Sequence, residues 1–112
     1  MAVTIRNIVP AKNVENVQTT QYTATNVTTV IDKCTATNYG AVAASISINL
    51  VTNADTAGNQ NLIVKTKMLQ PSETYTFPEI VGQVLNPGGF IATIASASSS
   101  INLRVSGREI TQ

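Results

Sequence analysis

Apolar and polar residues alternate along most of the chain with the two-residue period of β-strands. The clearest stretch is AVAASISINLV, residues 41–51. One alternate set in it is apolar: Val42, Ala44, Ile46, Ile48 and Leu50. The residues between them are small or polar, as a strand with one buried face requires. We therefore predict that the apolar set faces a core, and that the chain, which holds no helical stripe longer than two turns, is all-β.

Three further stretches show the same alternation. Over residues 28–37 the pattern places Val30, Cys34 and Ala36 on the inner face. Asp32 has the same parity, so we expect it near a sheet edge or accepting a hydrogen bond there. The other two predicted inward sets are Phe90, Ala92 and Ile94, and Ile101, Leu103 and Val105.

Turn residues separate these strands. The turn Gln70–Glu73 should place Tyr75 and Phe77 on a common face, and Asn86–Gly89 should lead tightly into Phe90. Loops are expected at residues 53–59 and 97–100. About eight short antiparallel strands result, spaced as in a β-sandwich or jelly roll.

The tetrapeptide TATN occurs twice, at residues 23–26 and 35–38. A duplication and a local β pattern both explain it. Nothing similar recurs later in the chain, and Asn supports turns. We therefore interpret each copy as the end of a β segment.

With 112 residues the chain is long enough for one domain and too short for two. Residues 1–18 are apolar in places and interrupted by Pro10, so they form either an arm that reaches a neighbouring subunit or the first strand of the sandwich. Residues 19–112 form the β-sandwich domain in both interpretations.

The composition has 43% hydrophobic but only 12% charged residues, against about 25% charged in ordinary soluble domains. The net charge of +1 neither repels other copies strongly nor attracts phosphates. We expect no nucleic-acid partner, because the basic residues are scattered and Trp is absent. No leader and no apolar run of about 18 residues is present, so we expect no membrane partner and no export before lysis.

Candidate catalytic and metal-binding groups are few. The absence of histidine excludes Ser-His-Asp and Cys-His systems. Cys34 has inward parity and is interpreted as a small buried hydrophobe, and Gly88-Gly89 precedes a strand, so it is a turn and no phosphate cradle. The loop 53–59 has oxygen ligands at alternate positions but lacks the closing Glu of a calcium loop. We predict no enzyme, no cofactor and no metal.

Several stretches together resemble a known class of protein. They are YTA (22–24), TTVIDKCTATN (28–38), LQPSETYTFPEIVGQVLNPGGFI (69–91) and VSGREI (105–110). This succession resembles small virion structural proteins of tailed bacteriophages, and most of all the jelly-roll cement or decoration proteins that reinforce the capsid from outside. Ser72 and Gly89 depart from the pattern, where Gly and an acidic residue are usual.

The resemblance implies a non-enzymatic protein that stabilises the phage head by binding across capsid subunits. A neck, tail or fibre-attachment adaptor is the alternative, and a carbohydrate-binding module is less favoured. The implied partners are the major capsid protein or another virion protein and further copies of this chain. The implied location is the virion, assembled in the host cytoplasm. The candidate interface residues are Arg6, Lys12, Lys65, Lys67 and Asp55.

Ile48→Asp should prevent soluble folding, because it places an unpaired charge in the predicted core. Soluble expression and thermal unfolding measure this. A variant that expresses and melts like the parent chain would contradict the predicted strand parity.

Overall fold

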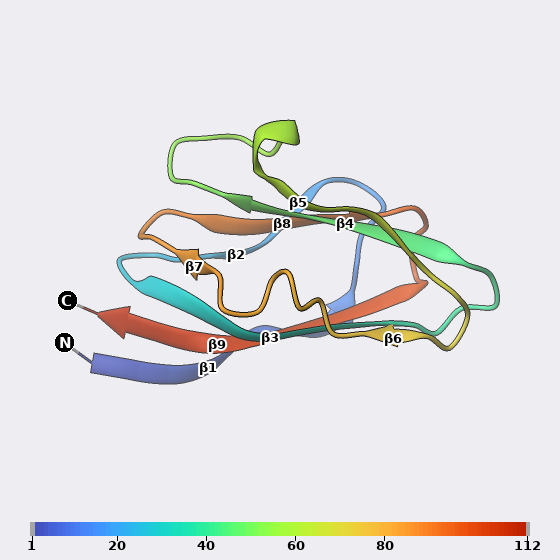
Figure 1. Ribbon diagram of the computed structural model, residues 1–112, viewed down its shortest axis with the longest axis horizontal. Helices are drawn as coiled ribbons and strands as arrows, with labels where there is room; N and C mark the ends of the chain where they lie inside the picture. The colour runs from blue at the N-terminus through green and yellow to red at the C-terminus, as the bar shows by residue number, and fades with distance from the viewer. Residues whose placement is uncertain (1, 112) are drawn as a thin grey trace.

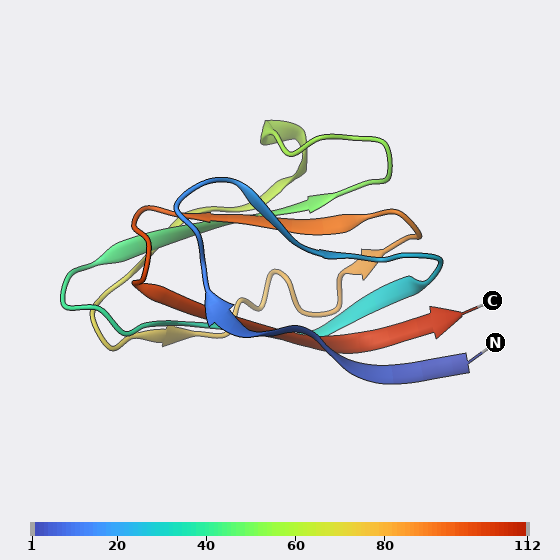
Figure 2. The same ribbon diagram turned by 180° about the vertical axis from the view of Figure 1, so that it is seen from behind.

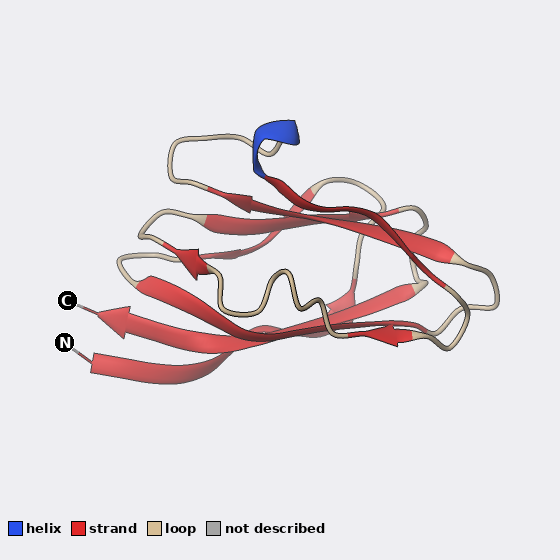
Figure 3. Ribbon diagram, in the orientation of Figure 1, coloured by secondary structure: helices blue, strands red, loops and turns tan. Residues whose placement is uncertain are grey.

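Two antiparallel β-sheets pack face to face in the computed structural model, which describes residues 2–111 (Figure 1). Sheet A consists of β1 (Ala2–Asn13), β9 (Ile101–Thr111), β3 (Thr28–Asn38), β6 (Thr74–Tyr75) and β7 (Val84–Leu85). Sheet B consists of β2 (Thr19–Thr23), β8 (Phe90–Ala95), β4 (Ala44–Val51) and β5 (Leu62–Leu69). The short 3-10 turn η1 (Asn59–Asn61) precedes β5 (Figure 3). The predicted all-β sandwich is confirmed.

The strands are paired in a nested order. β1 pairs with β9, β2 with β8, β3 with β6 and β7, and β4 with β5. The chain is thus one long antiparallel hairpin, wrapped so that β9 also pairs with β3 and β8 with β4. This is the winding of a jelly roll. The structure has nine strands where about eight were predicted, because β6 and β7 are two pieces of one interrupted strand beside β3.

The core lies between the sheets and contains most of the predicted inward residues. Ala44, Ile46 and Ile48 are buried, and Leu50 packs against the core from a partly exposed position. Ile101, Leu103 and Val105 are also buried there, as predicted. Within the stretch 41–51 Val42 is the exception, because β4 begins after it and the residue is 69% exposed.

A bulge in β3 changes the predicted parity of that strand. The pairing between β3 and β9 shifts register between Ile31 and Lys33. Cys34 and Ala36 are buried as predicted, but the inward residue before the shift is Ile31, so the prediction for Val30 was wrong. Asp32 lies at the bulge and accepts hydrogen bonds from the Arg108 guanidinium at 2.9–3.1 Å.

The parity predicted for β8 was also wrong. Ile91 and Ala95 belong to the core, whereas Phe90 and Ile94 are only half-buried on the other face. The two alternate sets of this six-residue strand are both largely apolar, so alternation alone did not distinguish them. Pairing decides the orientation, since Ile91 lies opposite Leu50 and Ala95 opposite Ile46.

Simple alternation would predict that Lys65 and Lys67 share one face of β5, but the structure separates them. Val64 lies opposite Ile48 and Lys67 opposite Ile46, with an extra residue between them on β5 and a positive φ of 50° at Thr66. Lys67 therefore points inward and lies over the Tyr75 ring at 4.4 Å, while Lys65 points outward. Tyr75 and Phe77 do share a face, with ring centroids 4.8 Å apart.

The two TATN segments end in turns, as predicted. Asn26 has a left-handed φ of 59° between β2 and β3. Asn38 is the last residue of β3, and its buried amide donates to the carbonyls of Val42 and Leu69 while its oxygen accepts from the Gly40 amide. Asn38 thus closes a β segment, whereas Asn26 lies in the turn three residues after β2 ends.

Gly107 has no room for a larger residue. A Cβ there would lie 2.4 Å from the carbonyl oxygen of Val30, beside the β3 bulge. Gly107→Ala should therefore destabilise the fold by about 1–3 kcal/mol, since backbone would have to move. Urea unfolding measures the loss, with the neighbouring Ser106→Ala as the control. Equal midpoints for the two variants would show that the ladder accommodates a Cβ.

Candidate functional site

The carboxylates of the structure are held by local donors. Lys12 donates to Glu15 at 2.7 Å, and Arg108 binds Asp32. The remaining four, Asp55, Glu73, Glu79 and Glu109, also accept hydrogen bonds from neighbouring groups. Among residues 2–111 no group of three or more His, Cys, Asp or Glu side chains is placed to hold a metal ion.

In the loop 53–59, the candidate calcium loop, backbone and side-chain amides donate to the carboxylate of Asp55. Asp55 accepts from the backbone amide of Thr56 at 2.8 Å and from the side chains of Gln60 and Asn61. Asn61 also donates to the Thr56 carbonyl and accepts from Asn49. These bonds tie the loop to β4 and engage the oxygens that a cation would need.

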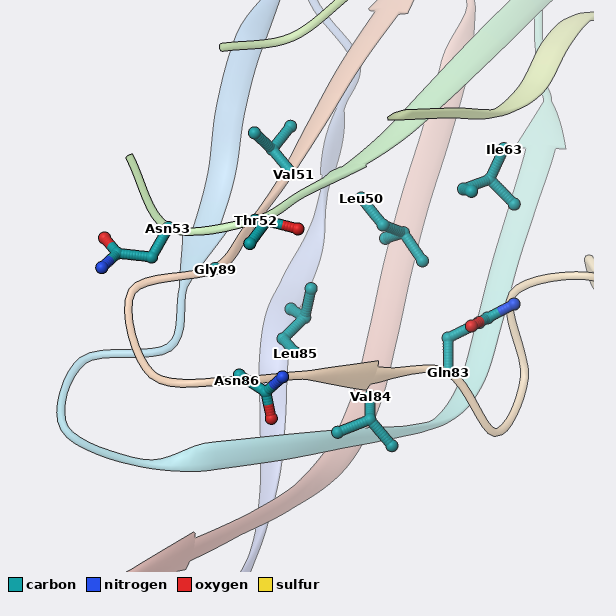
Figure 4. Close-up of a pocket in the computed structure, with 10 residues that line it drawn as sticks. All are labelled: Leu50, Val51, Thr52, Asn53, Ile63, Gln83, Val84, Leu85, Asn86 and Gly89. Atoms are coloured by element: carbon teal, nitrogen blue, oxygen red, sulfur yellow. The ribbon is translucent and has the colours of Figure 1, made fainter. Parts of the chain in front are cut away.

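A hollow of about 210 Å³ opens between β4 and β5 of one sheet and β7 of the other (Figure 4). Leu50, Ile63 and Leu85 form its apolar side, and the amides of Gln83 and Asn86 lie at its rim. Its volume falls below the roughly 300–1,000 Å³ of typical small-molecule sites. It is a gap where the short strand β7 leaves sheet edges unpaired.

A hydrogen-bonded network closes the end of the sandwich near the termini. Glu109, whose side chain is 14% exposed, accepts from Arg6 at 3.1 Å and from the Tyr22 hydroxyl at 2.5 Å. The same hydroxyl lies 2.6 Å from that of Thr29. Burial and the Glu109 carboxylate raise the pKa of Tyr22 to about 12. The phenol stays protonated, so the network links β1, β2, β3 and β9 structurally.

The outer face of sheet A carries an apolar surface beside this network. Val3 pairs with Ile110 in one row across the strands. In the next row Ile5 pairs with Arg108, Arg108 with Val30, and Val30 with Val84. Their neighbours along each strand point inward, so these side chains point outward. We call the set Val3, Ile5, Val30, Val84 and Ile110 the terminal apolar face.

Three residues of the terminal apolar face are open to solvent, and Val30 and Ile110 are partly buried. Val3 is 54% exposed, Ile5 84% and Val84 53%. The Asp32–Arg108 ion pair lies in its middle and leaves it without net charge. Contiguous exposed apolar surface on a folded chain commonly marks a site of protein contact.

The remainder of this outer face is polar and basic. Thr35, Thr37, Asn102, Ser106 and Ala11 line a shallow hollow of about 450 Å³ together with Lys33 and Arg104. Lys33 follows the β3 bulge and points outward with Thr35 and Thr37, so it contributes one of these cations. Sheet A thus presents an apolar half and a basic half side by side.

The edge of sheet A beside this face is formed by β1. Residues 2–7 are exposed, and β1 has a partner strand on one side only. Figure 2 shows its N-terminal part running beside the C-terminal end of β9. Its free side presents unpaired backbone groups.

The residues predicted for the interface lie in three separate places. Arg6 and Lys12 are on β1, and both form ion pairs within the chain. Lys65 and Lys67 are on β5, which is the outer strand of the other sheet. Asp55 is in the loop between β4 and η1. Of the five, Arg6 is next to the terminal apolar face.

Sequence reasoning did not identify Val3, Ile5 and Val84 as surface residues. The signal for Val3 and Ile5 was the apolar content of the N-terminal segment, and that for Val84 was its place in the apolar run of residues 80–85. Apolar residues read the same way in a sequence whether they face the core or the outer face of a sheet, so only the packing separates the two cases.

Comparisons with protein-family models, curated proteins and solved structures yield no match for this chain. Within residues 2–111, the structure has no helix of the length and apolarity needed to span a membrane.

Alkaline pH should destabilise the fold through one buried group, the Cys34 thiol, and one half-buried group, the Tyr22 phenol. Burial raises the pKa of the Cys34 thiol from 9.0 to about 12, and the pKa of Tyr22 rises from 10.0 to about 12. The folded chain keeps protons that the unfolded chain releases, so the free energy of unfolding should fall as pH rises from about 9 toward 12. Urea unfolding at a series of pH values measures this.

Tyr22→Phe and Cys34→Ala should each flatten the pH profile. Tyr39→Phe, which removes an exposed hydroxyl, is the matched control. Parallel profiles for all variants would mean that neither Tyr22 nor Cys34 contributes to the pH dependence of the free energy of unfolding.

Proposed function

We propose that this chain is a non-catalytic structural protein that binds other proteins through the outer face of sheet A. The observation that carries the proposal is the terminal apolar face, which spans β1, β9, β3 and β7, has three residues more than half exposed, and holds a compensated ion pair at its centre. The sequence resemblance supplies the setting: a cement or decoration protein on the head of a tailed phage, bound across capsid subunits.

The two halves of sheet A suit different parts of an interface. Burial of apolar area stabilises a complex by roughly 25 cal/mol per Å² before the costs of association. Lys33 and Arg104 would meet acidic or carbonyl groups at the rim and fix the orientation of the partner. Repetition of such a contact over a symmetric capsid would turn modest affinity into a stable coat.

The tyrosines give little support to glycan binding. Tyr22 is half-buried with its hydroxyl engaged by Glu109, and Lys67 lies over the Tyr75 ring. Tyr39, at 52% exposed, lies by itself after β3. A sugar-binding platform needs exposed rings together, and these three are in separate places.

Val84→Lys should weaken binding to the capsid by about tenfold or more, because it places a charge in the terminal apolar face. The side chain is 53% exposed, so the fold should tolerate the change. Met68→Lys, at 48% exposed on β5, is the control and should bind like the parent chain. Cosedimentation of the recombinant chain with bare capsids measures the affinity.

Cryo-electron microscopy of the same particles counts the copies. Hundreds of copies at capsomere junctions are expected. A single ring at one vertex would favour the neck or tail adaptor instead. Absence of binding, or equal binding by Val84→Lys and the parent chain, would overturn the assignment of this face.

A further inference from the structure

Three of the sheet edges among residues 2–111 carry features that prevent edge-to-edge pairing. β6 and β7 have two residues each, which is too short to template another strand. β5 carries Lys65, Lys67 and two register shifts, and β2 is a five-residue polar strand with one shift. Short strands, charges and bulges are the usual protection of exposed edges.

The fourth edge is protected over only part of its length. β1 has 12 residues, and its register shifts, Pro10 and Lys12 all follow Arg6. The part from Ala2 to Arg6 pairs with β9 in five consecutive positions without interruption. It therefore presents a regular, apolar and unpaired edge of the kind that binds another strand.

We propose that this edge pairs with β1 of a second copy of the chain, antiparallel about a two-fold axis at Thr4. The pattern AVTIR is self-complementary in that register. Val3 lies opposite Ile5 of the other copy, Thr4 opposite Thr4, and Ala2 opposite Arg6. A shift of the centre to Ile5 would instead set Val3 opposite Asn7, so Thr4 is the centre that joins the apolar side chains.

The charges near the β1 edge also favour a second copy of the chain as its partner. The Arg6 guanidinium is already bound by Glu109 of its own chain at 3.1 Å, so two edges can meet without bringing free charges together. The net charge of +1 per chain adds little repulsion. Residues 2–7 are exposed on both faces of the sheet, so this end of β1 leaves room for a neighbouring strand.

Pairing would also enlarge the proposed partner-binding surface, and to that extent the inference rests on the proposed function. Val3 and Ile5 lie at the margin of the terminal apolar face in one copy and would lie at its centre in two. The paired sheets would present one continuous apolar surface with a basic area at each end. A two-fold surface of this kind binds a repeated partner with avidity.

Cysteine cross-linking tests the register. Residues directly opposite in an antiparallel pair have Cα atoms about 4.5 or 5.5 Å apart, within the range of a disulfide. Thr4→Cys should therefore give a covalent dimer on mild oxidation, seen on a non-reducing gel. Ile5→Cys should cross-link far less, because its counterpart lies diagonally, beyond about 7 Å. Val42→Cys controls for random collision, and the native Cys34 is buried.

Solution mass tests the association itself. Sedimentation equilibrium should show the parent chain as a dimer and Ile5→Lys with a dissociation constant at least tenfold higher. Ile5 is 84% exposed, so the substitution should leave the thermal midpoint unchanged. Val42→Lys, at 69% exposed, is the matched control and should remain dimeric.

A monomeric parent chain at all concentrations without a Thr4→Cys cross-link would overturn the dimer. So would cross-linking of Ile5→Cys as fast as Thr4→Cys. Both results are independent of capsid binding: a monomer that still coats capsids would leave the proposed function standing, and a dimer that ignores capsids would remove the proposed function alone.

Discussion

The pairing of β9 with β3 is the constraint on which the rest of the structure depends. Ten paired positions join the last strand to the centre of sheet A, and β1, β6 and β7 add to the two sides of that pair. At its bulge the backbone of Val30 approaches so closely that only Gly107 fits opposite. The wrapped hairpin closes because these distant segments meet in one register.

The same bulge shapes the outer surface. It adds one residue to β3, so Ile31 and Cys34 both reach the core while Asp32 and Lys33 both turn outward. Asp32 then neutralises Arg108 inside the apolar half, and Lys33 joins Arg104 in the basic half. A single irregularity, required for core packing, thereby divides sheet A into two surfaces of different chemistry.

The sheet edges are unequally protected against pairing, because the N-terminal part of β1 lacks the bulges found on β2 and β5. An unprotected apolar edge exposes a chain to aggregation, and this edge lies beside an exposed apolar face, which together favour a specific occupant. Many polar groups form hydrogen bonds within the chain, such as those around Asp55 and Glu109, and these bonds hold the sandwich together. The proposal that the chain acts by assembly rests on this distribution of surfaces.

The sequence by itself determined the fold class, the positions of the turns, and the burial of Cys34, because alternation and turn residues act over a few positions. It did not determine which set of β8 faces inward or where Val30 and Lys67 point, since a one-residue bulge reverses parity and leaves no mark in composition. Whether Val3 and Ile5 meet a core or solvent depended on which face of sheet A packs against sheet B. Only the tertiary structure decided that, because the apolar pattern of a strand does not specify what covers it.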